Sequence, residues 1–130
     1  MPENATPIEQ RVRPRHCDAQ GMVYAPRYHE FCEDALLTWL EQQDKSYAGL
    51  RESGVDLVIT EVRYSYHRPA RLDDLLTITV DPAPIGDSAL QARFSIDRDV
   101  DHIADAAITF VAVRGGKRCP LPGSLREAAR

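Results

Sequence analysis

The spacing of hydrophobic and polar positions changes along the chain, and the first regular pattern is helical. From Pro26 onward, apolar side chains recur three and four residues apart. This spacing predicts one amphipathic helix of about 16 residues, or about 24 Å, which is long enough to span a sheet. The apolar stripe consists of Tyr28, Phe31, Cys32, Ala35, Leu36, Trp39 and Leu40.

After Gly54 the pattern becomes the alternation that is typical of strands. It predicts strands over 57–67, 75–80, 89–97 and 103–113, and a shorter strand precedes the helix over 8–13. In the first of the later strands, one face is predicted to carry Val58, Thr60, Val62, Tyr64 and Tyr66.

The segments between these patterns predict turns and short helices. Residues 81–86 carry two prolines and predict a turn. Residues 46–52 predict one or two helical turns. Near the end of the chain, Ser124 and Glu127 have the spacing of a capping box that opens a small helix.

One long helix followed by four strands with short connections favours an α+β fold in which an antiparallel sheet wraps around the helix. We expect one domain over 1–130, with peripheral tails over 1–7 and 118–130. A chain of 130 residues buries enough surface to fold without a disulfide or a structural metal.

Composition narrows the classes of partner and the compartment. The chain has 20 acidic and 16 basic side chains, a balance that disfavours binding to nucleic acid or to an anionic membrane. No apolar run approaches the ~20 residues of a membrane span, and no leader is expected. Cys17, Cys32 and Cys119 are odd in number and widely spaced, which favours a reducing compartment, the cytoplasm.

The loop before the helix holds the most informative chemistry. Asp18 lies a few residues upstream of the predicted helix start, and Gly21 permits a turn between them. The first N–H groups of a helix lack internal acceptors and carry the positive end of its dipole, so they stabilise an oxyanion. Asp18 can then act as a nucleophile or as a base that activates water. A local role for Asp18 in an Asx turn is the alternative.

Two segments resemble a known family. Residues 18–31, DAQGMVYAPRYHEF, are similar to the D-x-x-G-x-V-(Y/W)-x-x-x-Y motif of the 4-hydroxybenzoyl-CoA thioesterase family of hotdog-fold thioesterases. Residues 62–78, VRYSYHRPARLDDLLTI, resemble the strand and turn that follow in that family. The resemblance extends over about residues 8–113 and has the same order of elements.

This resemblance implies a hotdog fold, homodimers or homotetramers, and hydrolysis of an acyl thioester in a cleft between subunits. It implies no metal and no separate cofactor, because coenzyme A or a carrier's phosphopantetheine is part of the substrate. The catalytic carboxylate of the family maps to Asp18, its oxyanion-binding amide to the backbone N–H of Ala25, and its glycine turn to Gly21.

The chain departs from the family at three places. His16 stands where many members have a second aspartate, and Ala25 stands where one branch has a histidine. The segment 82–88 lacks the basic cluster with which some members hold the phosphates of coenzyme A. An acyl carrier protein therefore stays open as the source of the substrate.

Candidate substrate-binding residues are Tyr24, Tyr64, Tyr66, His67 and Arg68. Flat side chains with a polar contact suit an aromatic or polyketide-like acyl group, although core packing explains the tyrosines equally well. Arg68 is a candidate for contact with phosphate.

Several rival interpretations follow from the same residues. Cys17 as a nucleophile, Glu30 or Glu33 as the base, and a metal shared by His29 and Cys32 are each less favoured than Asp18 chemistry. The rival functions are a non-hydrolytic acyl-thioester binding protein and a hotdog dehydratase or hydratase.

Overall fold

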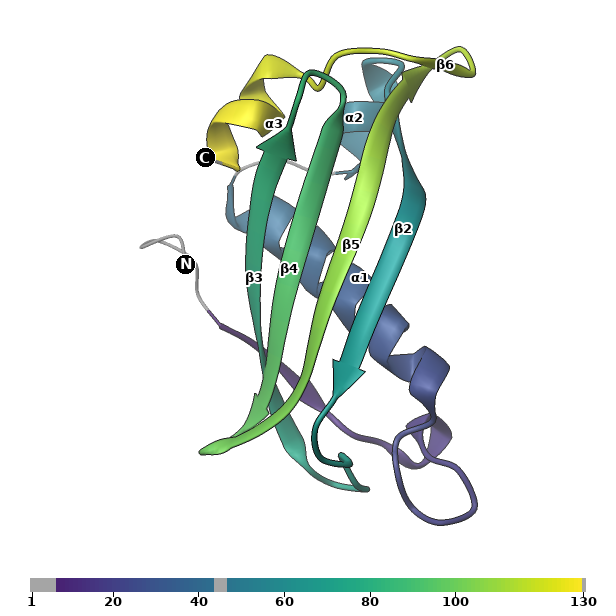
Figure 1. Cartoon of the computed structure of the whole chain (residues 1–130), viewed down its shortest axis with the longest axis vertical. Helices are drawn as coiled ribbons and strands as arrows, with labels where there is room; N and C mark the ends of the chain where they lie inside the picture. The colour runs from purple at the N-terminus through teal and green to yellow at the C-terminus, as the bar shows by residue number, and fades with distance from the viewer. Residues whose placement is uncertain (1–6, 44–46, 130) are drawn as a thin grey trace.

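A computed structural model describes residues 7–43 and 47–129, and in it one long helix crosses one face of a curled antiparallel sheet (Figure 1). The helices are α1 (Ala25–Gln42), α2 (Tyr47–Glu52) and α3 (Gly123–Ala128), and a short 3₁₀ helix occupies Pro14–His16. The strands are β1 (Ile8–Arg11), β2 (Asp56–Tyr66), β3 (Leu75–Ile85), β4 (Ala89–Arg98), β5 (Asp101–Arg114) and β6 (Lys117–Arg118).

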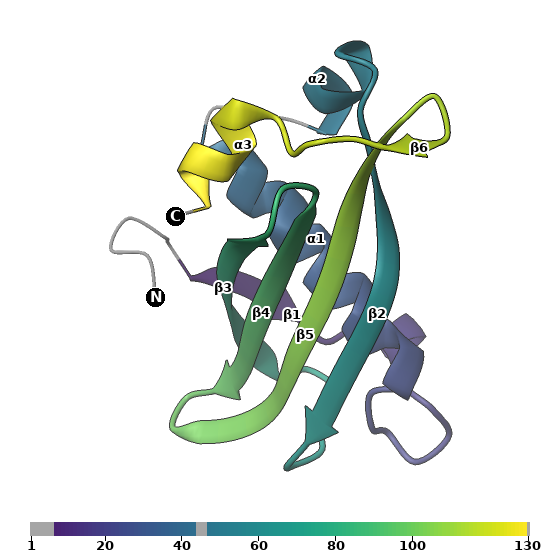
Figure 2. The same ribbon diagram turned by 45° about the horizontal axis from the view of Figure 1, so that its top comes forward.

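The strands lie in the order β1-β3-β4-β5-β2, all antiparallel, with β6 paired to the end of β5. β3, β4 and β5 follow one another as hairpins, and β2 reaches the far edge although it precedes them in the chain. Figure 2 shows the same arrangement after a turn of 45°, with α1 behind the sheet in both views. The predicted α+β fold with an antiparallel sheet around one helix is confirmed.

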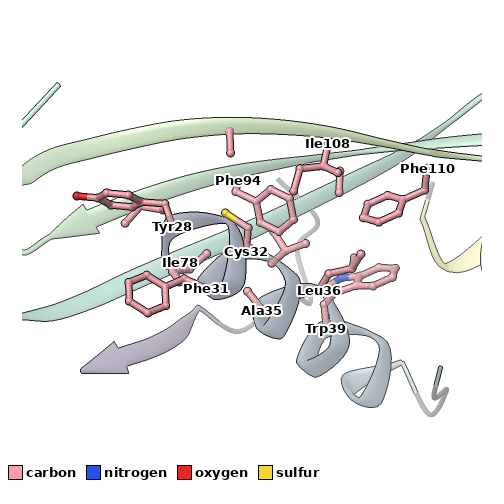
Figure 3. Close-up of a cluster of buried hydrophobic side chains, with 14 of the residues drawn as sticks. Tyr28, Phe31, Cys32, Ala35, Leu36, Trp39, Ile78, Phe94, Ile108 and Phe110 are labelled. Carbon is pink, nitrogen blue, oxygen red and sulfur yellow. The ribbon is translucent and has the colours of Figure 1, made fainter. Parts of the chain in front are cut away.

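The predicted apolar stripe of α1 forms the centre of the core. All seven of its side chains are buried, and they meet the inner faces of β3, β4 and β5 (Figure 3). Trp39, Ile78 and Ile108 are each exposed by no more than 1%. Burying side chains of this size contributes about 1.5–3 kcal/mol each, so the packing of α1 fixes where its first turn lies.

The turn predicted over 81–86 is wrong, because β3 continues through Ile85 and pairs with β4 along that whole length. The prolines Pro82 and Pro84 are two residues apart, so their missing N–H groups lie on the same side of the strand. Among the described residues, β1 pairs only with Leu75 to Ile78, which leaves β3 as an edge beyond that point. Proline is tolerated there because no neighbouring strand needs its N–H.

The predicted single face of β2 is interrupted by a β-bulge at Thr60. Ile59 pairs with Phe110 and Glu61 with Thr109, so the strand gains one residue between them. A slip of one residue exchanges the two faces of a strand. Before the bulge, Leu57 and Ile59 therefore lie on the inner side of the sheet, and after it Val62, Tyr64 and Tyr66 do.

The end of the chain forms the predicted small helix without the predicted capping box. α3 starts at Gly123 with Pro122 at its N-cap and no side-chain cap, so Ser124 lies within the first turn. The segment 118–130, expected as a peripheral tail, contributes Leu121 and Leu125 to the core, and they are exposed by 5% and 0%. None of the described helices is long and apolar enough to cross a membrane.

Two isoleucines of β3 provide a matched test of this core. Ile78 is exposed by 1% and Ile85 by 48%. We predict that Ile78→Ala lowers the free energy of unfolding by about 2–5 kcal/mol, because it leaves a cavity under α1. Ile85→Ala should change it by less than about 1 kcal/mol. Urea unfolding followed by circular dichroism measures both, and equal losses would contradict the assignment of Ile78 to the core.

Candidate active site

The loop that precedes α1 is a narrow ring closed by backbone hydrogen bonds. Cys17 and Val23 form an isolated bridge, and the Asp18 N–H donates to the Met22 carbonyl at 2.9 Å. The Gly21 N–H donates to the Asp18 carbonyl at 3.1 Å, with Gly21 at a φ of +79°. This left-handed conformation favours glycine, so the turn predicted at Gly21 is confirmed.

This loop is hydrogen-bonded to the segment that follows β2, so the two sequence motifs lie side by side. Met22 forms a bridge with Arg71, and the Val23 N–H donates to the Ala70 carbonyl at 2.9 Å. The Leu72 N–H donates to the Gly21 carbonyl at 3.1 Å. The loop therefore has a fixed position against the end of β2.

The carboxylate of Asp18 has a structural role in this loop. Its Oδ1 accepts the backbone N–H of Gln20 at 2.9 Å and that of Met22 at 3.2 Å. Among the described residues, both hydrogen bonds of this carboxylate end on Oδ1. Oδ2 is therefore the oxygen that can face a substrate or a water molecule.

Within the part of the chain that the structure describes, the first turn of α1 leaves one backbone donor without an acceptor. The Tyr24 N–H donates to the His16 carbonyl at 2.9 Å and the Arg27 N–H to the Tyr24 carbonyl at 2.8 Å, whereas Pro26 has no N–H. The N–H of Ala25, the first residue of the helix, has no acceptor within it, and no side chain caps the N-terminus. The positive end of the helix dipole strengthens the interaction of this N–H with a negatively charged oxygen.

Asp18 and Ala25 line one cavity of about 320 Å³. This cavity also brings together three of the predicted substrate-binding residues, Tyr66, His67 and Arg68. Met22, Val23, Tyr28 and Pro69 complete the lining. A carboxylate and an unpaired helix-start amide in one cavity are the two parts that acyl transfer requires, a base or nucleophile and an oxyanion donor.

Three predicted site residues lie outside this cavity. Tyr24 is 57% exposed at the N-cap of α1, and Gly21 shapes the loop without lining the cavity. Tyr64 is half-buried one step farther along β2, where its ring stacks on Tyr66 with centroids 6.0 Å apart and an angle of 6°. Tyr66 also contacts Tyr28, at 5.3 Å between centroids.

Tyr64 belongs to a hydrogen-bonded chain with the middle of α1. Its hydroxyl lies 2.8 Å from His29 Nδ1, and His29 Nε2 lies 2.6 Å from Glu33 Oε1. Burial raises the pKa of Tyr64 far above its usual value, and burial raises that of Cys32 to about 12. These groups are hydrogen-bonded to one another, and the metal considered for His29 and Cys32 gains no further ligand from the described residues.

The other rivals to Asp18 are placed away from the cavity. Cys17 has its thiol 3.6 Å from the Arg13 carbonyl, and burial, followed by the charge of Asp18, raises its pKa. The raised pKa keeps the thiol protonated, which makes Cys17 a poor nucleophile. Glu30 pairs with Arg27 at 2.9 Å on the outer side of α1.

His16 is a buried support of the loop, with 5% of its surface exposed. Its Nδ1 accepts the Arg13 N–H at 2.9 Å, and its ring packs edge-on against Phe31 at 4.8 Å. Burial, followed by the nearby Arg15, lowers its pKa. The neutral ring holds the backbone whose carbonyl accepts the Tyr24 N–H.

Sequence reasoning missed several lining residues. Tyr28 belongs to the predicted core stripe, and its hydroxyl accepts the Ala70 N–H at 3.3 Å while its ring lines the cavity. Met22 and Val23 are in the quoted loop motif and Pro69 in the second motif, so adjacency to these motifs is the signal that would have found them.

Comparison with known proteins agrees with this geometry. Residues 12–129 match the Thioesterase-like superfamily. The chain is 35% identical to the long-chain acyl-CoA thioesterase FadM of Escherichia coli K12 over 90% of this chain and 91% of that protein. It is 30% identical to the acyl-CoA thioester hydrolase YbgC of Escherichia coli O6:H1, with 88% of each chain covered.

Solved structures confirm the fold. The 1,4-dihydroxy-2-naphthoyl-CoA thioesterase Slr0204 from Synechocystis superposes with a TM-score of 0.89 at 20% identity, over 95% of this chain and 93% of that chain. The fold is thus a hotdog fold. The chain belongs to the Thioesterase-like superfamily, and it is a thioesterase.

The burial of His16 predicts a dependence of stability on pH. The unfolded chain protonates this imidazole near its ordinary pKa of 6.5, whereas the folded protein does so at a lower pH. Above pH 6.5 His16 is neutral in both states and does not lower the free energy of unfolding. As the pH falls from there toward the lower pKa of the folded state, the free energy of unfolding declines. His16→Asn keeps an acceptor for the Arg13 N–H without titrating.

We predict that the free energy of unfolding falls more steeply between about pH 7 and about pH 5 in the native protein than in His16→Asn. Urea unfolding at each pH measures the difference, and the other titrating groups contribute equally to both proteins. Parallel pH profiles would exclude a neutral buried His16.

Proposed function

We propose that this thioesterase hydrolyses acyl-CoA, with Asp18 as its catalytic carboxylate and the Ala25 N–H as its oxyanion donor. The observation that carries the proposal is that these two groups line the same cavity. The likeness to FadM and YbgC, which are named for acyl-CoA substrates, supports coenzyme A as the thiol. The DAQGMVY loop supports a place within the 4-hydroxybenzoyl-CoA thioesterase branch of the superfamily.

In the proposed reaction the thioester carbonyl lies at the start of α1 with its oxygen toward Ala25. Asp18 Oδ2 takes a proton from water as the water oxygen attacks the carbonyl carbon, or it attacks that carbon itself and the acyl-enzyme is then hydrolysed. Negative charge develops on the carbonyl oxygen, where the N–H and the helix dipole stabilise it. In the first route the C–S bond then breaks and the sulfur takes the proton held by Asp18, which leaves the thiol and the free acid. In the second route the C–S bond breaks as the acyl-enzyme forms, and the water that hydrolyses it supplies the proton for the thiol.

The walls of the cavity suit an aromatic acyl group. Tyr28 and Tyr66 present rings 5.3 Å apart, and Tyr64 extends the stack along β2. The volume of about 320 Å³ is near the lower end for small-molecule sites. Arg68 at the rim, 3.5 Å from Asp101, offers a guanidinium to a phosphate of coenzyme A.

A long aliphatic acyl group is the second candidate, and a specific feature favours it. A further apolar groove of about 240 Å³ lies beside the second half of α1, lined by Leu36, Leu37, Leu40, Ile59 and Phe110 among others. The contact chain from Tyr66 through Tyr64, His29 and Glu33 leads from the first cavity to this groove.

We further propose a cytoplasmic homodimer that pairs through β2. The three cysteines are free, which suits a reducing compartment. β2 is an edge strand with exposed apolar side chains, among them Val58 at 46%, Val62 at 40% and Tyr66 at 51%. Edge strands offer unpaired backbone groups to a second chain, and pairing along β2 would cover Tyr66 and enclose the cavity.

The catalytic role proposed for Asp18 is tested by substitution. Asp18→Asn keeps an Oδ1 that accepts the Gln20 and Met22 N–H groups, so the loop should persist, whereas the catalytic carboxylate is lost. We predict a fall in kcat of about 10²–10⁴-fold with KM little changed. Thiol release from benzoyl-CoA, octanoyl-CoA and hexadecanoyl-CoA, corrected for the three cysteines of the protein, measures it.

The comparison with Asp18→Ala separates the two roles of this carboxylate. The alanine variant should lose activity and also unfold at lower urea, since two backbone N–H groups lose their acceptor. An asparagine variant with native turnover would remove Asp18 from the mechanism. If the native protein releases no thiol from any acyl-CoA but does so from an acylated carrier protein, the substrate is the carrier thioester. If no thiol is released from acyl-CoA or from the acylated carrier protein, the result favours a non-hydrolytic binding protein. Hydration of a crotonyl thioester would instead favour a hydratase.

The proposed dimer is also tested by substitution. Val62→Lys places a charge on the exposed edge strand, and we predict that it shifts the protein from dimer to monomer in analytical ultracentrifugation and lowers activity. Ile85→Lys on β3, at a similar exposure of 48%, is the matched control and should leave the dimer intact. Dissociation by both variants, or by neither, would place the interface elsewhere than β2.

A further inference from the structure

A second cluster of polar side chains lies at the rim of the cavity, on segments far apart in the chain. His67 follows the end of β2, His102 and Asp105 are in β5, and Asp97 is in β4. The register of β4 and β5 places Asp97 opposite His102 and Ser95 opposite Asp105. The sheet thus brings two imidazoles and two carboxylates to one end of three neighbouring strands.

Both imidazoles converge on one carboxylate. His67 Nε2 lies 2.9 Å from Asp105 Oδ2, and His102 Nε2 lies 2.9 Å from Asp105 Oδ1. The two rings stack with centroids 4.9 Å apart and an angle of 28° between their planes. One potential ligand atom from each of the three residues lies within 4.8 Å of the other two.

The fourth residue orients one of these imidazoles. His102 Nδ1 lies 2.7 Å from Asp97 Oδ1, and Asp97 Oδ2 accepts a hydrogen bond from the Ser95 hydroxyl at 3.2 Å. A histidine that binds a metal through one nitrogen commonly donates the other N–H to a carboxylate, which fixes the ring and its tautomer. Asp97 holds His102 in this way, with Nε2 directed at Asp105.

We propose that His67, His102 and Asp105 form a binding site for a divalent transition-metal ion of the Zn²⁺ class. Two imidazole nitrogens and one carboxylate suit Zn²⁺, Co²⁺, Ni²⁺ or Cu²⁺, whereas Ca²⁺ and Mg²⁺ prefer oxygen ligands alone. Zn–N distances of about 2.0–2.1 Å with tetrahedral angles place ligand atoms roughly 3.4 Å apart. Because the present atoms lie up to 4.8 Å apart, binding requires these exposed side chains to rotate closer together.

The exposure of the cluster defines what kind of metal site it is. The side chains of His67, His102 and Asp105 are exposed by 45%, 40% and 54%. Three protein ligands with an open side leave at least one coordination position for water or another small ligand. Because His67 also lines the Asp18 and Ala25 cavity, a bound ion would lie beside the entrance to that cavity.

Binding would exchange protons for the metal ion. His102 gives up the Nε2 proton that it shares with Asp105, whereas His67 coordinates in the neutral form that carries its proton on Nδ1; the Nε2 lone pairs and an oxygen of Asp105 then bind the ion. The proton on Nδ1 of His102 stays with Asp97. The sequence resemblance implied no metal, and no motif points to this site, because His67 lies 35 positions before His102 and on a different segment from β5, which carries His102 and Asp105.

Titration of the full chain with Zn²⁺ by calorimetry, after removal of metal with a chelator that is then dialysed away, tests the proposal. We expect one ion per chain. Asp105→Asn and His102→Ala should each weaken binding by more than about 100-fold, and Asp97→Asn by about 10–100-fold. Asp101→Asn is the matched control. It removes a carboxylate at the same end of the sheet, and the ion pairs of that carboxylate are with Arg68 and Arg98 rather than with a histidine.

Co²⁺ distinguishes these ligands from the free cysteines. Bound Co²⁺ should absorb weakly in the visible region without the near-ultraviolet charge-transfer band that thiolate ligands produce. The proposal is overturned if the native protein binds no Zn²⁺, in which case the cluster is an ion-pair network. A thiolate band, or native affinity in His102→Ala, also overturns it. Urea unfolding confirms that each variant is folded.

Discussion

The hydrogen bond from the Tyr24 N–H to the His16 carbonyl is the contact on which the site depends. It closes the loop at the point where α1 begins, beside Ala25, which lines the cavity and is followed by Pro26, a residue without an N–H. The contact stays in place because His16 is itself held from both sides, by the Arg13 N–H and by the ring of Phe31. The buried imidazole of His16 thus helps to hold the start of α1 at Ala25, although its ring does not contact Ala25.

The packing of α1 against the sheet divides the helix between stability and chemistry. Its apolar stripe binds it to β3, β4 and β5, while its first turn reaches the end of β2. Tyr28 takes part in both, because its ring lies in the core and its hydroxyl accepts the N–H of Ala70 in the segment that anchors the loop. The cavity therefore has a buried wall at Tyr28 on the helix side and an exposed one at Tyr66 on β2.

The helix stripe, the strand order along the chain and the main parts of the site could be predicted from the sequence because each depends on local periodicity or on an adjacent motif. What could not be predicted depends on neighbours in the sheet. Pro82 and Pro84 are typical of a turn unless the strand is known to have a free side. The bulge at Thr60 leaves no trace in the alternation. The group around Asp105 draws on three strands, and no spacing in the sequence relates His67 to His102.

The structural and chemical readings of Asp18 are compatible, because they use different oxygens. Oδ1 accepts two backbone N–H groups and so holds the carboxylate in one orientation. Asp18 lines the cavity with its second oxygen outside these two hydrogen bonds, so a catalytic role would not require the turn to break, and the fixed carboxylate would be preorganised for it. The Asx turn and the catalytic role proposed for Asp18 therefore do not exclude each other. The same reasoning explains why asparagine, which keeps the turn and loses the charge, is the informative substitution at this position.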